Sequence, residues 1–323
     1  FENGKLIAQR APLSRTSRLT VTEIDLALIS AERRKNSAFF CDASEHLAVE
    51  FSLKSKATRL TRKISPAPFL PSDSNKIGER CATIINMQAQ GLARRLTAAH
   101  AKKAVIGISG GLDSCLALLV CAHAMDILGR DRSDILAVTM PCFGTTARTR
   151  TNAEILCEQL RTEFKSIDIG ESVMRHFADI GHDPAKTDVV FENAQARERT
   201  QVLMDYASVV GGIVVGTGDL SELALGWCTY NGDHMSMYSV NGTVPKTLMR
   251  WMIDAISETE SFAAAHDVLQ DVLDTPISPE LLPPDASGKI SQQTEDLVGP
   301  YALHDFFIYH ILRYGYAPEK VYA

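Results

Sequence analysis

The stretch "GISGGLDSCLALL", residues 107–119, decides the fold of this chain. It follows the short apolar run "KAVI" and leads into further apolar residues, so it predicts a strand, a tight turn and a helix in direct succession. The first backbone N–H groups of such a helix lack partners and its dipole favours negative charge, which suits a phosphate. Gly110 and Gly111 remove side chains that would block its approach. The stretch therefore predicts a phosphate-binding loop.

Three polar side chains of the same stretch extend this interpretation. Ser109 and Ser114 can add hydroxyl donors, whereas Asp113 repels a bare phosphate unless a cation lies between them, and Mg²⁺ is the expected mediator. The spacing matches neither the GxxxxGK[ST] pattern of P-loop proteins nor the GxGxxG pattern of dinucleotide-binding proteins. A turn followed by a simple helix N-cap is the plainer alternative, but the string "SGGLDS" is more specific than a lone pair of glycines.

Strands and helices alternate around this loop. Apolar runs predict buried strands at 104–108, 134–140, 164–169 and 211–217. Apolar periodicity predicts helices at 79–100, 113–128, 146–160 and 192–210. The alternation indicates an α/β fold with a doubly wound, Rossmann-like parallel sheet. Ligands of such sheets bind beyond the carboxyl ends of the strands, so the segments "GISGGLDS" and "GTGDLSE" are expected to lie together.

Composition sets further limits on function. The 323 residues are 45% hydrophobic and 22% charged, which is typical of a globular chain. A net charge of -6 gives no general attraction to nucleic acid or to an anionic membrane, so neither is expected as a partner. The seven cysteines are scattered without a CxxC pair, and no apolar run approaches the roughly 20 residues that span a bilayer. These features favour a cytoplasmic protein.

The chain divides into three predicted segments. Residues 1–55 alternate apolar and polar positions in "GKLIAQ", "RLTVTEIDLAL" and "LAVEFSL", which predicts short strands. Residues 56–78 are rich in proline and basic residues, which is typical of a linker, and residues 79–323 contain the alternation of strands and helices. Because the chain starts at Phe1 without a methionine, we expect it to be part of a longer protein.

The string "SGGLDS" resembles the SGGxDS loop of the ATP pyrophosphatases, which include GMP synthetase, asparagine synthetase, tRNA-thiolation enzymes and NAD synthetase. The segment "VVGTGDLSELALGWCTYNGDHMSMYSVNGTVPKTLMRW" is similar to the NAD synthetases, in particular to the long bacterial form that carries its own glutaminase. Segments 140–153, 191–205, 274–283 and 294–307 resemble this family in the same order. The resemblance implies the fold of the family and its reaction, the ATP-driven amidation of deamido-NAD to NAD with release of AMP and pyrophosphate.

The resemblance also implies roles for particular residues. Those that would bind ATP are Gly107, Ile108, Ser109, Gly110, Gly111, Leu112, Asp113, Ser114, Thr217 and Lys246. Those that would bind deamido-NAD are Asn193, Arg197, Glu222, Trp227, Tyr230 and Asp233. The catalytic residues would be Asp113, Ser114 and Lys246, and Asp113 with Glu222 would hold Mg²⁺. Lys246 also follows Pro245 at a predicted helix start, where the dipole disfavours a cation, and this placement favours a phosphate contact.

The two ends of the chain bear on its partners. Residues 1–55 resemble the last strands of the nitrilase-like glutaminase in the long form, whose catalytic Glu, Lys and Cys do not map onto this chain. The piece is therefore expected to use free ammonia, which a glutaminase domain would supply in the full-length enzyme. The family continues beyond "YAPEKVYA", so residues 79–323 are expected to be a synthetase domain truncated at its C-terminus. Apolar helices at 80–99 and 115–128, together with the resemblance, favour a homo-oligomer, at least a dimer.

Two alternatives stay open at this point. Another SGGxDS enzyme, of the GMP synthetase or tRNA-modifying type, would need a catalytic cysteine pair, a different partner domain or a basic face for tRNA, and none is visible. A non-catalytic nucleotide-binding module would keep the phosphate glycines but could lose the carboxylates. Asp113 and Glu222 are both present, which favours catalysis.

Overall fold

The computed structural model describes residues 1–10, 16–36, 38, 47, 49–52, 60–144, 147–232, 234–275, 281 and 294–323. The described chain forms two compact units. One consists of Phe69–Asp305, and the other consists of Phe1–Pro68 together with Phe306–Ala323. The larger unit contains the sheet and the candidate site. The division after Pro68 falls inside the segment 56–78, for which the sequence predicts a linker.

A five-stranded parallel sheet forms the centre of the larger unit. Its strands are β1 (Ala104–Gly107), β2 (Ile135–Thr139), β3 (Glu163–Ser166), β4 (Ile213–Gly216) and β5 (Tyr238–Ser239). Their order in the sheet is β3-β2-β1-β4-β5, and every neighbouring pair is parallel. The chain builds outward from β1 to β3 and then returns to the other side of β1 with β4. The direction reverses between β1 and β4, which is where a sheet of this kind opens a crevice at its carboxyl edge.

The helices are divided between the two units. Those that lie wholly in the larger unit are α2 (Ile77–Ala98), α3 (Leu112–Leu128), α4 (Ala147–Leu160), α5 (Gly170–Ile180), α6 (Val189–Val210), α7 (Leu220–Leu225), α8 (Lys246–Ser257), α9 (His266–Leu273) and α10 (Thr294–Val298), with the 3-10 helices η1 (Ser74–Lys76), η2 (Arg132–Asp134) and η3 (Glu260–Ala265). Helix α11 (Tyr301–Tyr314) begins in the larger unit and continues into the smaller one, which also contains α1 (Leu26–Lys35) and α12 (Pro318–Tyr322). Over the described ranges, none of these helices combines the length and apolar character that crossing a membrane requires.

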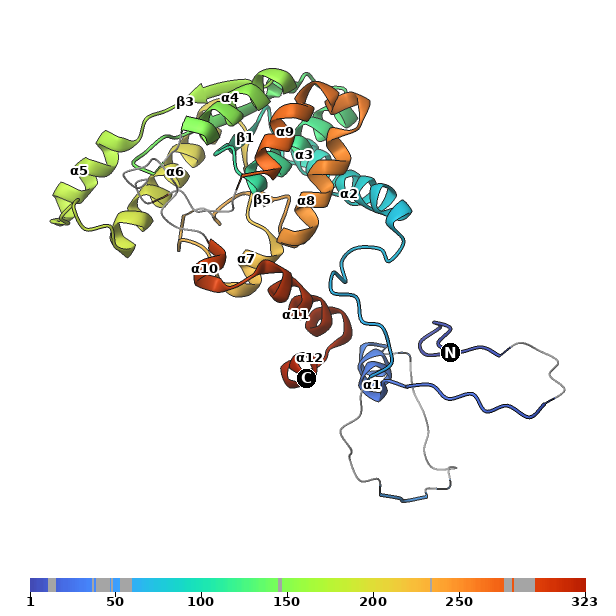
Figure 1. Ribbon diagram of the computed structural model, residues 1–323. Coiled ribbons are helices and arrows are strands. Elements are labelled where there is room, and N and C mark those ends of the chain that lie inside the picture. The colour runs from blue at the N-terminus through green and yellow to red at the C-terminus, as the bar shows by residue number, and fades with distance from the viewer. Residues whose placement is uncertain are drawn as a thin grey trace. The chain divides into compact units, whose positions relative to one another are not determined.

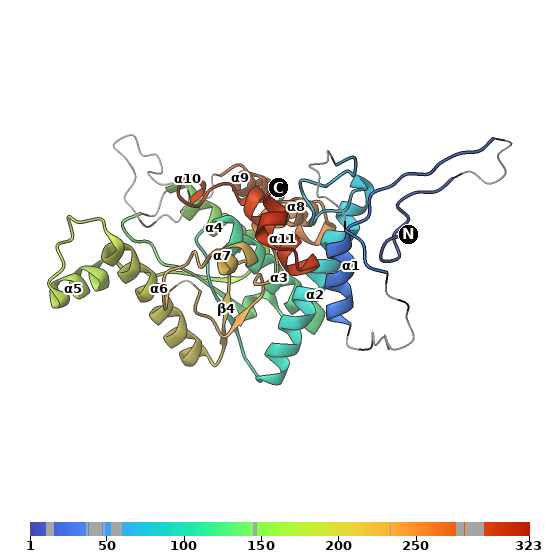
Figure 2. The same ribbon diagram turned by 90° about the horizontal axis from the view of Figure 1, so that it is seen from below.

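Helices cover both faces of the sheet, because alternate side chains of each strand point to opposite faces. Ala104 and Ile106 of β1 belong to an apolar cluster with α2, α3, α4, α8 and α9, whereas Val105 belongs to a second cluster with α5 and α6. Figures 1 and 2 show α5 and α6 on one side of the strands and α2 and α3 on the other. The predicted doubly wound parallel sheet is therefore confirmed.

Between residues 79 and 217 the strands and α-helices lie where the sequence predicts them, except that one α-helix was missed, and no bounds were predicted for the elements after residue 217. The helices predicted at 113–128 and 146–160 are confirmed as α3 and α4. The missed helix is α5, which buries Val173 and Phe177 and ends at Gly181 in the left-handed conformation, with φ of +72°. The two buried side chains, one turn apart, and the terminal glycine are the signal that could have revealed α5.

The strands predicted in residues 1–55 are wrong wherever the structure describes that segment. Its described residues contain one isolated bridge, between Glu2 and Lys5, and the helix α1. Asp25 caps this helix by accepting a hydrogen bond from the backbone N–H of Leu28, at 3.1 Å, and the last turn is basic. These capping signals favour a helix by themselves, whereas a strand also needs a neighbouring strand for its backbone hydrogen bonds. The alternation alone is therefore not enough to form a strand there.

The helix at 115–128, which the sequence favours for a dimer interface, is mostly buried within the chain. Most of its side chains, from Cys115 to Ala122, are buried against the sheet and against α2 within the same chain. The continuous apolar character of this helix therefore marks a core helix. Helix α2 keeps an exposed outer side, where Met87 is 70% exposed.

Candidate functional site

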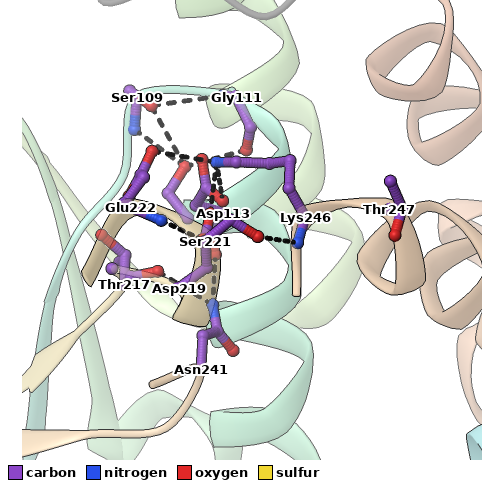
Figure 3. A network of polar contacts seen from close by, with 12 residues as sticks. Ser109, Gly111, Asp113, Thr217, Asp219, Ser221, Glu222, Asn241, Lys246 and Thr247 are labelled. Carbon is purple, nitrogen blue, oxygen red and sulfur yellow. Dashed lines mark hydrogen bonds and ion pairs between the residues drawn. The ribbon is translucent and has the colours of Figure 1, made fainter. Parts of the chain in front are cut away.

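The loop between β1 and α3 lies at the switch point of the sheet, and its own serines close it. The backbone N–H of Ser109 donates to Ser114 Oγ at 3.3 Å, and Ser114 Oγ donates to the carbonyl of Gly111 at 3.1 Å (Figure 3). The N–H of Gly111 in turn donates to Ser109 Oγ at 3.2 Å. The hydroxyl groups of Ser109 and Ser114, for which the sequence predicts a phosphate contact, thus also stabilise the conformation of the turn.

Gly110 allows this loop to pass close to α4. Its φ is +85°, and a Cβ at this position would lie 2.1 Å from the backbone carbonyl oxygen of Thr149. Gly111 is different, because its φ of -85° suits any residue and its Cβ would meet only Ser109 Oγ, at 3.4 Å. Position 110 therefore requires glycine, because any side chain there would clash with α4 and strain the backbone. Position 111 has room for a Cβ atom.

Gly110→Ala is expected to lower the free energy of unfolding by at least about 2 kcal/mol, because the variant combines a disfavoured φ with a backbone clash. Gly111→Ala is the matched control and should change it by no more than about 0.5 kcal/mol. Urea denaturation of both variants measures the difference. Equal stability of the two variants would contradict the loop geometry.

Lys246 lies at the centre of three carboxylates (Figure 3). Its Nζ is 2.6 Å from Asp113 Oδ1, 2.6 Å from Asp219 Oδ2 and 3.0 Å from Glu222 Oε1. Asp113 comes from the first turn of α3, Asp219 is the N-cap of α7, and Glu222 lies in the first turn of α7. Lys246 is the first residue of α8 and is only 1% exposed. The three carboxylates offer oxygens that all lie within 4.8 Å of one another.

The charges of this cluster depend on one another. Burial, and then the nearby Asp113 carboxylate, raise the pKa of Glu222 to about 8. Burial also raises the pKa of Asp219 to about 6, although Lys246 opposes the shift. Burial disfavours the charged form of Lys246, but the three carboxylates together outweigh it and raise the pKa of the lysine well above its ordinary value. Lys246 is therefore an ammonium throughout the neutral range.

The raised pKa values of Asp219 and Glu222 predict that the protein without divalent cations loses stability as the pH rises. Between their unfolded values, near 4, and about 8, the folded protein holds protons that the unfolded chain has released, so folding is favoured at the acidic end of this range. Lys246 stays charged over this range, so it does not contribute to the pH dependence of the free energy of unfolding. The other groups that face the cluster are Asp113 and Tyr301.

Urea denaturation between pH 5 and pH 8.5, in the presence of a chelator, measures this dependence. Glu222→Gln removes one of the titrating groups and should flatten the decline by up to about 1.4 kcal/mol per pH unit near pH 7. Identical slopes for the wild type and the variant would contradict the assignment.

Asp305 of α11 fixes the start of α8. Its Oδ2 accepts hydrogen bonds from the backbone N–H of Thr247, at 2.9 Å, and from Thr247 Oγ1, at 2.5 Å. Its Oδ1 accepts from Ser221 Oγ at 2.5 Å, and Ser221 Oγ accepts from the backbone N–H of Lys246 at 2.9 Å. Because the N-cap of α8 is Pro245, whose side chain cannot accept a hydrogen bond, Asp305 supplies the capping carboxylate and sets the direction in which Lys246 leaves the helix.

Asn241 connects the segment that follows β1 with the segment that follows β4. Its Nδ2 donates to the backbone carbonyls of Asp113, at 3.0 Å, and of Thr217, at 3.1 Å (Figure 3). Its Oδ1 accepts from Gln88 Nε2 of α2 at 3.2 Å. Asn241 is completely buried, so these bonds hold the start of α3 against the end of β4.

A cavity of about 580 Å³ opens at the carboxyl ends of β1 and β4. The predicted residues that line it are Gly107, Ile108, Ser109, Asp113, Ser114, Asn193, Thr217, Glu222 and Trp227. Helix α6 adds Glu192, Arg199 and Thr200 to the wall, which the sequence analysis did not single out. The two strand-end motifs thus meet in one cavity, as the order of the strands requires.

Other predicted site residues lie away from the cavity wall. Gly110, Gly111, Leu112 and Lys246 are not among the described residues that line it. The first two lie in the loop, Leu112 begins α3, and Lys246 contacts Asp113 and Glu222 of the wall. Arg197 and Tyr230 contact each other, since Arg197 Nε donates to the carbonyl of Tyr230 at 3.1 Å, and neither is among the residues that line the cavity in the described chain. Asp233 lies outside the described residues.

Asp219, Asn241 and Asp305, which organise the site, were not predicted as site residues from the sequence. Asp219 was quoted within "GTGDLSE" without a role, although an aspartate three residues before a glutamate is a common helix-capping signal. Asn241 and Asp305 carry no local signal, because their partners lie far away in the chain.

A parallel sheet with a glycine-rich loop at its switch point, and with carboxylates facing a cavity there, defines a doubly wound α/β protein with a ligand site at the strand ends. The family profile named NAD synthase matches residues 84–308. The chain belongs to the NAD synthase family.

Relatives with assigned names support this membership. The chain is 43% identical, over 99% of its length, to the glutamine-dependent NAD(+) synthetase of Mycobacterium leprae, of which it covers 49%. It is 31% identical, over 54% of its length, to the NH(3)-dependent NAD(+) synthetase of Fusobacterium nucleatum, of which it covers 64%. The chain therefore spans about half the length of the first of these relatives.

Solved structures agree with the fold. The NH3-dependent NAD synthetase of Campylobacter jejuni matches with a TM-score of 0.50 and 25% identity, over 56% of this chain and 76% of that chain. The glutamine-dependent NAD+ synthetase of Acinetobacter baumannii, solved with ADP, matches with a TM-score of 0.54 and 21% identity, over 75% of this chain and 41% of that chain. The second likeness bears on the fold alone.

Proposed function

We propose that this chain catalyses the ATP-dependent amidation of deamido-NAD to NAD, with release of AMP and pyrophosphate. The observation that carries the proposal is the meeting of the loop 107–114 with Asp113 and Glu222 in one cavity at the strand ends. Membership of the NAD synthase family, and the names of the relatives, support this choice of substrates. The ATP phosphates would lie over the loop, because the first backbone N–H groups of a helix favour negative charge and α3 begins at Leu112.

The donor set fits Mg²⁺. Asp113, Asp219 and Glu222 offer only carboxylate oxygens, which this cation prefers, and those oxygens lie within 4.8 Å of one another. Asp113 and Glu222 line the cavity and would hold the ion. When bound there, Mg²⁺ would neutralise part of the negative charge on the phosphates.

The chain's own groups account for the rest of the reaction. An oxygen of the nicotinate carboxylate attacks the α-phosphorus of ATP, and the bond to the β-phosphate breaks, so that pyrophosphate leaves toward the loop. Lys246, held as an ammonium, stabilises the departing negative charge. Ammonia then attacks the acyl carbon of the adenylated intermediate, AMP leaves, and the nitrogen loses a proton to form the amide.

The second substrate would occupy the α6 side of the cavity. Asn193 lies on the wall there, and Trp227 offers an indole ring on which the nicotinate ring could stack. Arg197 and Tyr230, which contact each other outside the wall, would meet deamido-NAD only at the rim. Asp233 is retained as a candidate contact from the resemblance alone.

We further propose the setting in which the full-length protein works. A glutaminase domain of the same chain would supply the ammonia, since the M. leprae relative is named as glutamine-dependent and is about twice as long. The protein would act in the cytoplasm as a homo-oligomer, at least a dimer, and the exposed side of α2 is the part of the predicted interface that remains free.

The test of this function is a product assay. The protein is incubated with ATP, Mg²⁺, deamido-NAD and ammonium, and NAD, AMP and pyrophosphate are followed by chromatography. Equal amounts of the three products are expected. AMP without NAD would point to a different acceptor, as in other SGGxDS enzymes, and binding of ATP without turnover would point to a non-catalytic module. Either result would overturn the proposal.

A further inference from the structure

Lys246 has three carboxylate partners that differ in position. Asp219 is completely buried and is not among the described residues that line the cavity, whereas Asp113 and Glu222 line it and their side chains are 26% and 25% exposed. The lysine is therefore held from the protein side by one carboxylate and from the cavity side by two.

Asp219 is also the partner that is least able to move. Its Oδ1 accepts a hydrogen bond from the backbone N–H of Glu222 at 2.9 Å, which caps α7, while its Oδ2 is 2.6 Å from Lys246 Nζ. The segments that carry Asp219 and Lys246 are joined directly, because the backbone N–H of Leu220 donates to the carbonyl of Val244 at 3.0 Å. Asp219 Oδ1 is thus fixed by a hydrogen bond, and the buried Oδ2 lacks a hydrogen bond and faces the Lys246 ammonium as an ion pair.

The balance of charge gives this arrangement a consequence. With all four groups ionised, three carboxylates face one ammonium, and the two excess negative charges match one divalent cation. If Asp113 and Glu222 turn to such a cation, Lys246 keeps a partner only if Asp219 stays in place. A buried ammonium without any partner would be strongly unfavourable.

We propose that Asp219 is the positioning residue of Lys246: it holds the ammonium directly behind the two cavity-lining carboxylates, so that Asp113 and Glu222 can bind a divalent cation while the remaining N–H groups of Lys246 turn to a nucleotide phosphate. This inference rests on the proposed function for the identity of the nucleotide. The mutual distances of the three carboxylates alone would allow each of them to bind the cation. The inference assigns Asp113 and Glu222 to the cation and Asp219 to Lys246.

The experiment compares Asp219→Asn with Asp113→Asn in two binding measurements. Asparagine keeps the oxygen that caps α7 but removes the charge that holds Lys246. Asp219→Asn should weaken binding of a non-hydrolysable ATP analogue, at saturating Mg²⁺, by at least about tenfold, because the buried ion pair that orients Lys246 is lost. It should leave the affinity for Mn²⁺ alone within about threefold of wild type. Asp113→Asn should weaken Mn²⁺ binding by at least about tenfold.

Controls separate positioning from capping. Asp131→Asn makes the same change at a remote helix cap, where Asp131 Oδ1 accepts from the backbone N–H of Ser133 at 2.8 Å, and it should alter neither affinity. Asp219→Glu restores the charge and should recover part of the nucleotide affinity. If Asp219→Asn weakens Mn²⁺ binding as much as Asp113→Asn does, Asp219 is a cation ligand and the inference fails. Unchanged nucleotide affinity in Asp219→Asn would also overturn it.

A measurement on the wild-type protein decides the matter if the Asp219 variant does not fold. With ¹⁵N-labelled lysine, the Lys246 ammonium should give a signal that is protected from solvent and that persists at saturation with Mg²⁺ and the ATP analogue. Loss of that signal while the protein stays folded would show that Lys246 leaves Asp219. None of these readouts requires NAD to form, so failure of the product assay would refute the proposed function without deciding the role of Asp219.

Discussion

Asp113→Ala is expected to lower the rate of AMP and NAD formation by at least about a thousandfold while the protein remains folded. Asp113 is one of the two cavity-lining carboxylates that would hold Mg²⁺ against the phosphates, and the resemblance to the SGGxDS loop points to the same residue. Its side chain is 26% exposed and contributes little to the core. Lys246 keeps Asp219 and Glu222 as partners in the variant, so the free energy of unfolding should change by no more than about 1 kcal/mol.

Asp126→Ala on the same helix is the matched control for this prediction. Asp126 forms a surface ion pair with Arg132, at 2.6 Å, far from the cavity wall. Its variant should retain activity within about twofold of wild type, since exposed ion pairs contribute little. The product assay measures both variants. Wild-type rates in Asp113→Ala would remove this carboxylate from the mechanism.

Lys246→Met is expected to lower the free energy of unfolding by about 3–5 kcal/mol at pH 8, because it leaves buried carboxylates without their counter-charge. Lys246 is 1% exposed, so solvent does not screen the loss. Without the ammonium, the pKa values of Asp219 and Glu222 should rise further, since Lys246 is the main group that lowers both. The folded variant then holds protons that the unfolded chain lacks, and its deficit in stability should shrink as the pH falls toward 6.

Lys103→Met provides the control for that substitution. Lys103 pairs with Glu163 at 2.5 Å near the surface, and its loss should cost no more than about 1 kcal/mol at either pH. Urea denaturation at pH 6 and pH 8 gives all the values required. A loss of stability in Lys246→Met that is small, or that grows as the pH falls, would contradict the structure of the cluster.

The part of the fold that could be predicted is the part that local signals determine. The residues after β1 must turn sharply to start α3. The sequence signals of this turn are adjacent to one another: Gly110, which has a positive φ, and the apolar run that follows it. The order of strands and helices then places the ends of β1 and β4 side by side, because parallel strands end at the same edge of a sheet.

The arrangement around Lys246 could not be predicted in the same way. The place of this lysine at a helix start predicts a phosphate contact, and nothing near it in the sequence predicts three carboxylate partners. Two of those partners are 24 and 27 positions away and the third is 133 positions away, so no periodicity links them. Asp305, which caps α8 from α11, is likewise invisible to a local pattern.

The amino-terminal residues show the opposite error. The alternation in "RLTVTEIDLAL" is the usual sign of a strand, yet residues 26–35 form α1. Leu19 and Val21 are 88% and 80% exposed, so no neighbouring strand or helix covers them within the described chain. A period of two in the sequence indicates which side chains share a face, but it supplies no partner strand. The predicted glutaminase remnant in residues 1–55 stays a prediction.

The most direct test of the central claim follows the oxygen atoms of the nicotinate carboxylate. Deamido-NAD labelled with ¹⁸O in both carboxylate oxygens is converted in the presence of ATP, Mg²⁺ and ammonium, and the products are analysed by mass spectrometry. Attack of the carboxylate on the α-phosphorus predicts one ¹⁸O atom in AMP, one in the amide of NAD and none in pyrophosphate. Unlabelled AMP, or ADP with labelled inorganic phosphate, would contradict the account.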